Sequence, residues 1–489
     1  MDFKTLVADP AALDDVAADA LLVVVAAAPL SVAPEVLSPA LAKALKEAVD
    51  AGDISVKAGQ SLYAHRLAGV KAGRVNFNVA ADASTKAVAK AVSAGVAALK
   101  GGGSKHIAVA LVGSAQIDAA QAQAMVVAVQ DALYVYRHTK PSAPAASKLG
   151  VVSLVCTKAQ QSEVARGLRQ GVAVAAGIEL ARECANRPGN HCTPTYLASV
   201  AKGLGKSHGL KVEVLERKDA EKLGMGSFLA VAQGSAEPPK FIVARYQGAA
   251  KTVRPVVLVG KGITFDTGGI SIKPAGDMDE MKFDMGGAAS VLGTLRAVAE
   301  LKAKVNLVGI IPACENMPSG TAIKPGDVVT SMSGQTIEIL NTDAEGRLIL
   351  CDALTYAERF KPAVVVDIAT LTGACIVALG HHRSGLFCGD DELAAQLLAA
   401  GDAAIDPAWR MPLDEEYDEA LKSNFADMGN VGGRAGGAIT AAMFLKRYTK
   451  AYPWAHLDVA GTAWKSGANK GATGRPVGLL TQFVLSRAA

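Results

Sequence analysis

Apolar runs of strand length alternate with Ala-rich stretches of helical spacing along the chain, and this alternation most constrains its fold. In the first third, buried strands are predicted at 21–25, 106–112 and 151–155. Helical stretches lie between them, at 87–99 and 117–136. Strands that alternate with helices are typical of an α/β domain with a largely parallel sheet. We therefore predict such a domain at the N-terminus.

The alternation resumes after residue 186. The predicted strands are 211–215, 240–246, 255–259, 305–311 and 361–368, and the predicted helices between them are 219–232 and 288–301. This pattern predicts a larger α/β/α sandwich with a mixed sheet. In such folds the functional groups usually lie in loops at the carboxyl ends of the strands.

One long amphipathic helical pattern, residues 162–185, separates the two parts. It ends before the stretch 186–190, where Pro188 and Gly189 interrupt the chain. A length of 489 residues suits two or three domains. We predict a smaller N-terminal α/β domain at 1–165, a linker helix at 166–186 and a larger domain at 187–489.

Composition is that of a globular protein and argues against two other classes. Half of the residues are hydrophobic and a fifth are charged, which suits a sizeable core. The formal net charge of +4 is no global signature of a nucleic-acid binder, although a sum does not report a local patch. The apolar run Ala20–Ala28 stops at Pro29 after nine residues, far short of a membrane span. We predict a buried strand there.

The N-terminus and the cysteines predict a cytoplasmic location. Met1–Thr5 lacks the basic and apolar regions of a signal peptide. The seven cysteines form no C-x-x-C pair and their number is odd. Reduced, mostly buried thiols are the interpretation that this usage favours.

The histidines do not predict a zinc protease site of the histidine type. There are eight of them, and no H-E-x-x-H pattern occurs. The neighbours His381 and His382 would not share one face of a helix, because that needs a spacing of three or four residues.

Polar residues gather at two places in the second part. Lys261, Asp266, Lys273 and Asp284 all follow the strand predicted at 255–259. Taken singly, each suits a solvated turn. The octapeptide Asn341–Leu348 holds the second group, and it runs into an apolar helical segment.

The acidic residues of that octapeptide are open to two interpretations. Asp343 and Glu345, with Arg347 beside them, suit a capped helix start, where carboxylates favour the positive end of the helix dipole. They also suit a metal site, since crowded carboxylates repel unless cations neutralise them.

Counted together, the two groups predict a dinuclear metal site. Three Asp and one Glu carry four negative charges, which would balance two divalent cations. Oxygen-rich ligands without Cys or His suit Mn²⁺ or Mg²⁺, and carboxylates also accept Zn²⁺. Two such ions, roughly 3.5–4 Å apart, lower the pKa of a shared water and polarise a carbonyl.

Three motifs carry a resemblance to a known family. The stretches 261–269, 284–289 and 341–348 resemble the signature of the cytosolic leucyl aminopeptidases, peptidase family M17. The resemblance extends over 186–489 and includes 370–374 and 454–461. The first domain shares only the family's general layout, a macro-like α/β domain. A metallo-aminopeptidase that releases N-terminal residues in intracellular peptide turnover is the function that this resemblance implies.

The resemblance also implies which residues hold the metals. One ion would be bound by Asp266, Asp343 and Glu345, and the other by Lys261, Asp266, Asp284 and Glu345. Lys261 would then be a neutral amine ligand, which requires a strongly depressed pKa. A nearby dication and burial both act in that direction.

Two further residues are implied to be catalytic. Lys273 would stay protonated and stabilise the oxyanion of the reaction. Arg347 would hold a bicarbonate ion as a proton relay, since its planar fork matches a carbonate-like anion. The free α-amino group of the substrate would bind a metal, which restricts cleavage to the N-terminus.

The substrate pocket follows from the resemblance by position. Met281, Thr370 and Gly373 would line an apolar pocket that suits a side chain such as Leu, and Leu371 would offer its backbone carbonyl. For Met281, ordinary core packing is the alternative.

The resemblance implies a homohexamer, a dimer of trimers, that acts on peptides with a free N-terminus. Two other functions are alternatives. A two-metal phosphohydrolase would also use clustered carboxylates. A DNA-binding architectural or regulatory role, known for some bacterial members, would need a basic groove and steep salt dependence.

Overall fold

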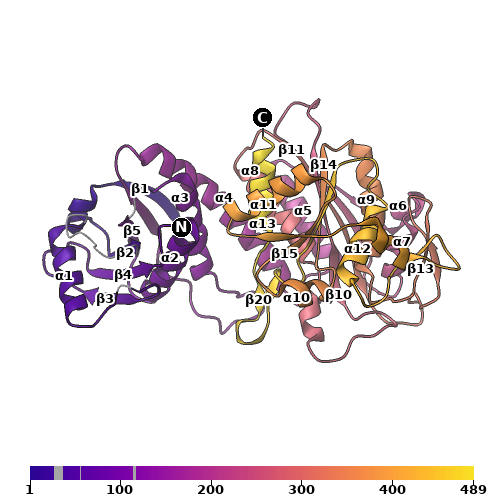
Figure 1. The fold of residues 1–489 in the computed structure, drawn as a ribbon, viewed down its shortest axis with the longest axis horizontal. Coiled ribbons are helices and arrows are strands. Elements are labelled where there is room, and N and C mark those ends of the chain that lie inside the picture. Colours follow the sequence, from indigo (N-terminus) through magenta and orange to yellow (C-terminus); the bar gives the residue numbers. More distant parts are fainter. Residues whose placement is uncertain (27–36, 56, 114–116, 489) are drawn as a thin grey trace. The chain divides into compact units, whose positions relative to one another are not determined.

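The computed structural model describes residues 1–26, 37–55, 57–113 and 117–488. Contacts within the chain separate two compact units, Met1–Ala175 and Ala176–Ala489. Both are α/β units, and the second is the larger and contains a mixed sheet (Figure 1). The predicted fold class is therefore confirmed. The domain limits predicted above stay predictions, and the division by contacts falls inside helix α4 (Gln161–Asn186).

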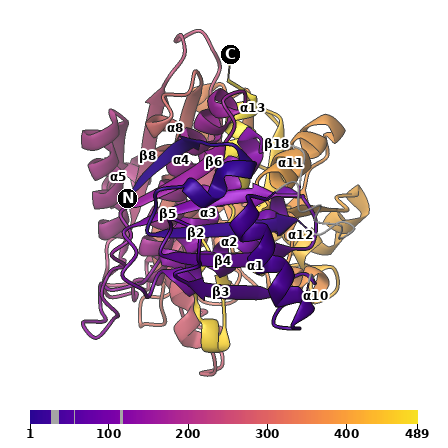
Figure 2. The ribbon, with the colours of Figure 1, turned by 90° about the vertical axis from the view of Figure 1, so that its left-hand side faces the viewer.

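The first unit contains a six-stranded sheet in the order β1-β6-β5-β2-β4-β3 (Figure 2). Its strands are β1 Asp2–Val7, β2 Ala20–Ala26, β3 Ser61–His65, β4 Arg74–Ala80, β5 His106–Val112 and β6 Val151–Cys156. All neighbours are parallel except β3 and β4. The predicted strand 106–112 is β5. Of the apolar run Ala20–Ala28, the first seven residues form β2, and residues 27 and 28 lie outside the described part.

Helices cover both faces of this sheet. The helices are α1 Pro39–Asp50, α2 Thr85–Leu99 and α3 Ala119–Leu133, and η1 Pro10–Asp15 is a short 3-10 helix. Apolar residues of α2, α3 and the first part of α4 pack on one face, and those of α1 and η1 on the other. Ser84 caps α2 by accepting from the Ala87 amide, and Asp118 and Gln121 form a capping box for α3.

The second unit is built on a mixed sheet in the order β16-β15-β18-β14-β9-β11-β8-β7, with β10 paired to β11. These strands are β7 Lys211–Leu215, β8 Lys240–Gln247, β9 Val256–Gly260, β10 Gly262–Asp266, β11 Asn306–Asn316, β14 Val364–Ala369, β15 Ser384–Phe387, β16 Ala408–Met411 and β18 Trp454–Asp458. The central neighbours β11, β9, β14 and β18 run parallel. Their carboxyl ends therefore meet at one edge.

Two helical layers enclose this sheet and complete the sandwich. The helices are α5 Pro194–His208, α6 Arg217–Lys222, α7 Gly226–Ala232, α8 Gly286–Glu300, α9 Gly346–Ala357, α10 Gly373–Leu379, α11 Asp391–Ala403, α12 Gly437–Lys446 and α13 Val477–Ser486. Apolar residues of α5, α8, α11 and α13 fill one face, and those of α7, α9 and α12 fill the other. The near-continuous apolar strands of the sequence are explained by this burial on both sides.

Short elements complete the second unit. They are β12 Val328–Thr330, β13 Thr336–Glu338, β17 Met428–Gly429, β19 Trp464–Lys465 and β20 Gly471–Ala472, with the 3-10 helices η3 Met278–Phe283, η4 Glu358–Phe360, η5 Glu415–Leu421 and η6 Gly467–Asn469. One predicted helix differs: 219–232 is two helices, α6 and α7. Gly224, at φ +70°, has left the helical conformation between them.

Two expectations from composition can be set against the described residues. Within them, no helix is both long and apolar enough to cross a membrane. All seven cysteines are free and buried, as their usage predicted.

Candidate metal centre

The site begins where β9 ends, and it depends on a close approach of two glycines. Gly287, in the first turn of α8, lies so close to the strands that a Cβ there would meet the Ile368 carbonyl oxygen at 2.1 Å. A Cβ on Gly260 would meet the Gly287 oxygen at 2.5 Å. Only residues without a side chain permit this packing. It brings the segment before α8, and with it Asp284, against the ends of β9 and β14.

Lys261 leaves the end of β9 and is enclosed by acceptors. Its ammonium lies 2.8 Å from Asp284 Oδ2 and 2.8 Å from Glu345 Oε1. It also donates to the Thr370 carbonyl at 2.9 Å. A Cβ on Gly346 would meet the Lys261 Cε at 2.7 Å. The Gly of the octapeptide therefore leaves the space that this lysine side chain occupies.

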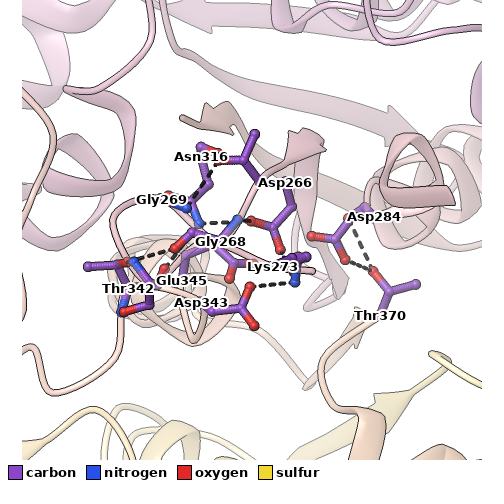
Figure 3. Close-up of polar contacts among 12 residues, drawn as sticks. Asp266, Gly268, Gly269, Lys273, Asp284, Asn316, Thr342, Asp343, Glu345 and Thr370 are labelled. Carbon is purple, nitrogen blue, oxygen red and sulfur yellow. Dashed lines mark hydrogen bonds and ion pairs between the residues drawn. The ribbon is translucent and has the colours of Figure 1, made fainter. Parts of the chain in front are cut away.

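Lys273 approaches the same carboxylates from a turn. Gly268 and Gly269 have φ of +88° and +69°, so that the chain after β10 folds back. The Lys273 ammonium lies 2.8 Å from Asp266 Oδ2 and also contacts Asp343 Oδ1 (Figure 3). The two lysines thus share one acidic cluster, and each contacts a different part of it.

Thr342 joins the octapeptide to the turn after β10. Its hydroxyl donates to the Gly268 carbonyl at 2.6 Å and accepts from the Ser271 amide at 2.8 Å (Figure 3). The structure thereby brings Asp343 and Glu345 to the residues that follow β9, although they are far apart in the sequence.

Two asparagines of the site were missed by sequence reasoning. Asn316, at the end of β11, donates to Asp266 Oδ1 at 2.8 Å and to the Thr342 carbonyl at 3.0 Å. Asn430, fully buried after β17, accepts from the Leu340 amide at 2.8 Å. The signal for Asn316 was its position: a polar residue at the carboxyl end of a buried strand.

Arg347 lies on the first turn of α9 and is held by a backbone group. Its Nη1 donates to the Asn430 carbonyl at 2.7 Å. Its Nε is buried and has no hydrogen-bond partner in the described part of the chain. Burial lowers the pKa of Arg347 to about 10, although Glu345 and Asp458 act in the opposite direction. The group is therefore still a cation at neutral pH.

The pKa values of the cluster follow from burial and from an excess of carboxylates. Burial raises the pKa of Asp266, Asp284 and Asp343, and for Asp266 the nearby Glu345 raises it further. For Lys261 and Lys273 burial lowers the pKa, but the carboxylates outweigh it and the net pKa is raised. The neutral Lys261 that the resemblance implies would thus require bound dications, and it stays a prediction.

The donor set fits divalent cations. Asp266, Asp343 and Glu345 offer oxygens that all lie within 4.8 Å of one another. Within this cluster, as the structure describes it, three buried carboxylate oxygens have no hydrogen bond: Asp284 Oδ2, Asp343 Oδ1 and Glu345 Oε1. Each lies near a lysine ammonium, but not in hydrogen-bonding geometry. Four carboxylates against two ammonium groups leave two negative charges when all are ionised, and this excess attracts divalent cations.

Of the predicted substrate-binding residues, some contact this cluster and others are linked to it only by their position in the chain. Thr370 is part of it, since its hydroxyl donates to Asp284 Oδ1 at 2.7 Å (Figure 3). Leu371 follows, half-buried, and Gly373 is exposed at the start of α10. Met281 is half-buried on η3, three residues before Asp284. For Met281 and Gly373 the link to the site is therefore their position in the chain.

Comparisons with known proteins point to one family. The model of the catalytic domain of the cytosol aminopeptidase family matches residues 179–481, and that of its N-terminal domain matches residues 21–142. A probable cytosol aminopeptidase of Methylibium petroleiphilum is 67% identical over 487 residues, 100% of each chain. A second one, from a Polaromonas species, is 57% identical over 100% of this chain and 95% of its own.

Solved structures agree with the sequence comparisons. A mutant of tomato leucine aminopeptidase superposes with a TM-score of 0.88 at 34% identity, over 99% of this chain and 96% of its own. The bottromycin maturation enzyme BotP in complex with Mn superposes with a TM-score of 0.84 at 33% identity, over 97% of this chain and 100% of its own.

Proposed function

Because the chain belongs to the cytosol aminopeptidase family and is a peptidase, we propose that it removes N-terminal residues from peptides with two divalent metal ions. The observation that carries this proposal is the buried cluster of Asp266, Asp284, Asp343 and Glu345. It holds more negative charge than its two lysines neutralise, and three of its oxygens lack hydrogen bonds.

The ligand sets follow the resemblance. Asp266, Asp343 and Glu345 would hold one ion, and Lys261, Asp266, Asp284 and Glu345 the other. When bound, the ions would lower the pKa of a water molecule and polarise the scissile carbonyl. Mn²⁺, Zn²⁺ and Mg²⁺ all accept such ligands, and the Mn complex of BotP supports Mn²⁺ first.

The two lysines differ in exposure, and this suggests different roles. The Lys261 side chain is 3% exposed, whereas that of Lys273 is 20% exposed. A substrate can therefore reach Lys273 but not Lys261. The carboxylates around Lys273 raise the pKa of its ammonium, so that it stays charged and can stabilise negative charge on the carbonyl oxygen.

Arg347 is proposed to hold bicarbonate and thereby to assist proton transfer. Its Nη1 is occupied by Asn430, and its buried Nε has no partner in the described residues. A guanidinium with unused donors suits a planar anion.

Substrate specificity would come from the free N-terminus of the substrate and from a small pocket for its first side chain. A free α-amino group can bind a metal, whereas an acetylated one cannot, and this limits cleavage to the N-terminal bond. Met281, Thr370 and Gly373 would line the side-chain pocket, and Leu371 would offer its carbonyl. A Met with two small residues suits Leu or a similar apolar side chain.

The setting of the enzyme is proposed from its relatives. They are named as cytosol aminopeptidases, which supports a cytoplasmic enzyme of peptide turnover. A homohexamer, a dimer of trimers, is proposed on the family resemblance. The phosphohydrolase and DNA-binding hypotheses gain no support from the sequence relatives, which are named as aminopeptidases.

Removal and return of metal tests this proposal. We expect dialysis against a chelator to abolish release of leucine from leucine p-nitroanilide, and Mn²⁺ to restore it better than Mg²⁺. N-acetyl-leucine p-nitroanilide is the matched control and should not be cleaved. Equal cleavage of both anilides, or full activity after metal removal confirmed by elemental analysis, would contradict the proposal.

A further inference from the structure

One motif of the sequence has no part in the function proposed so far: residues 454–461, which begin with β18. Side chains of a strand alternate between its two faces, so Trp454, His456 and Asp458 lie on the same face. All three are buried. Burying such a row of polar side chains costs free energy unless they form hydrogen bonds. The partners of these hydrogen bonds show which segments the row holds in place.

The first half of this row is bonded within the sheet. Asp367 of β14 lies opposite His456 in the register of the two strands. It accepts from His456 Nδ1 at 2.5 Å and from Trp454 Nε1 at 2.7 Å. These hydrogen bonds join β14 to β18 and therefore stabilise the sheet.

Asp458 is different, because its carboxylate holds the loop after β14. Oδ2 accepts from the Thr372 hydroxyl at 2.7 Å, and Oδ1 accepts from the Leu371 amide at 3.3 Å. Oδ1 also accepts from the Ala460 amide at 3.1 Å. Leu371 is thus fixed on both sides, at its own N–H and at the side chain of the next residue.

The other side of this loop is fixed by the metal centre. The Thr370 carbonyl accepts from Lys261, and the Thr370 hydroxyl donates to Asp284 Oδ1. The Leu371 residue therefore lies between two anchors. Its carbonyl direction depends on rotation about the bond between its Cα and carbonyl carbon, and the bonds of Asp458 to Leu371 and Thr372 span this bond.

We propose that Asp458 is a positioning residue that aims the Leu371 carbonyl at the N–H of the scissile peptide bond. This proposal rests on the proposed aminopeptidase function. A carbonyl needs a donor. If the α-amine of the substrate binds a metal, the scissile N–H is the next donor along the substrate chain. Asp458 itself touches no reacting atom and acts through the loop.

Asp352 provides a matched control for a purely structural role. It is also fully buried, and its carboxylate also accepts from two backbone amides, Phe228 at 2.9 Å and Met332 at 2.7 Å. These amides belong to α7 and to the turn after β12, not to the loop after β14. Loss of Asp352 therefore removes similar bonds at a different place.

The test compares leucyl-glycine with its depsipeptide, in which an ester oxygen replaces the scissile N–H. Asp458→Ala should lower kcat/KM for the peptide at least 10-fold more than for the ester, with the wild-type metal content. Such a loss is the size expected for a mispositioned contact. Asp352→Ala should leave the peptide-to-ester ratio unchanged.

Asp458→Asn provides the rescue. Its Oδ1 can still accept from Leu371, and its Nδ2 can donate to the Thr372 hydroxyl, so the ratio should return to near the wild-type value. If Asp458→Ala does not fold, Thr372→Val removes one of the two bonds and should shift the ratio about 3-fold, as one modest hydrogen bond would. Thr372→Ser should not shift it.

The outcomes separate this proposal from the function on which it rests. Equal losses for peptide and ester in Asp458→Ala, or an Asp458→Asn variant as impaired as Asp458→Ala, would overturn the positioning role while the wild type stays an aminopeptidase. A wild type that cleaves neither substrate would instead refute the proposed function, and the positioning role with it.

Discussion

The two units of this chain have similar architecture but bury different chemistry. In the described part of the first unit, the buried polar residues are all neutral: Ser38, Asn76, Asn78, Ser104, Gln121, Gln123 and Ser153. The second unit buries ionisable groups, including both partners of ion pairs such as Lys261 and Glu345.

This difference in buried charge indicates which unit carries the function. A buried neutral side chain needs only one or two hydrogen bonds, such as the one from the Ser38 hydroxyl to Asp14 Oδ1 at 2.5 Å. A buried charge costs several kcal/mol unless it is paired, so a cluster of charges is retained only where something uses it. We infer that the catalytic residues lie in the second unit. The buried polar residues of the first unit serve only the stability of that unit.

The largest expected effect comes from removing the carboxylate that the ligand sets share. Glu345→Ala should lower kcat/KM more than 10³-fold and reduce the bound metal, because both ions would lose a ligand. Elemental analysis and leucine release measure the two effects. Asn78→Ala in the first unit is the control, with activity per folded protein expected to be unchanged. Full metal content in Glu345→Ala would refute the shared-ligand assignment.

Removal of the accessible cation should have the next largest effect. Lys273→Met should lower kcat about 10²–10³-fold, as loss of a group that stabilises an oxyanion does. The metal content should persist, since Lys273 is proposed to contact substrate and not to bind an ion. A variant that loses its metals would show that Lys273 serves mainly to neutralise Asp266 and Asp343.

A buried ionisable group in the second unit should make the free energy of unfolding depend on pH. Burial raises the pKa of Asp352 to about 7, from an ordinary value of 3.8. Between these values the folded state binds a proton that the unfolded state does not. The free energy of unfolding should therefore fall as pH rises from about 4 to 7, by up to about 1.4 kcal/mol per pH unit.

Denaturant unfolding of the second unit at pH 5 and pH 8 measures this slope. Asp352→Asn should flatten it, because the amide does not titrate, even if the variant is less stable at both pH values. A slope that is unchanged in Asp352→Asn would mean that another group is responsible. A neutral buried group such as Gln121 should not alter the slope when it is replaced.

The elements of both units could largely be predicted from local patterns. The strand at 106–112 and the helix after Glu345 follow directly from the spacing of apolar residues. The break at Gly224 was missed, because apolar residues continue through it on both sides. A single glycine within such a run does not reveal which conformation it will adopt.

The candidate site was predictable as a set of residues but not as a geometry. The motifs identify Asp266 and Asp343, but the bonds of Thr342 to the turn after β10 bring them together. The order of strands places Asn316 beside Asp266 and Asp458 beside the loop after β14. Asn430 follows β17 of a separate three-stranded sheet and accepts from Arg347. Each is a single polar residue near the end of a strand, and no local pattern says which strand will be its neighbour. The linker helix at 166–186 stays a prediction.

The smallest expected effect concerns the first unit. Ser84 caps α2 of the first unit by accepting from the Ala87 amide at 3.3 Å. Ser84→Ala should destabilise this unit by about 1 kcal/mol, the usual cost of a lost helix cap, and thermal unfolding measures it. Because the buried polar residues in the described part of this unit are all neutral, kcat/KM for leucine p-nitroanilide should stay the same.

The contrary result for Ser84→Ala would be informative. A fall in kcat/KM at full folded content would mean that the first unit influences the site in the second, and the division of roles between the two units would be wrong. Ser84→Asp keeps an N-cap acceptor and adds a carboxylate at the positive end of the helix dipole. It should restore the stability, so a fall in activity that persisted in Ser84→Asp could not be a consequence of the lost cap.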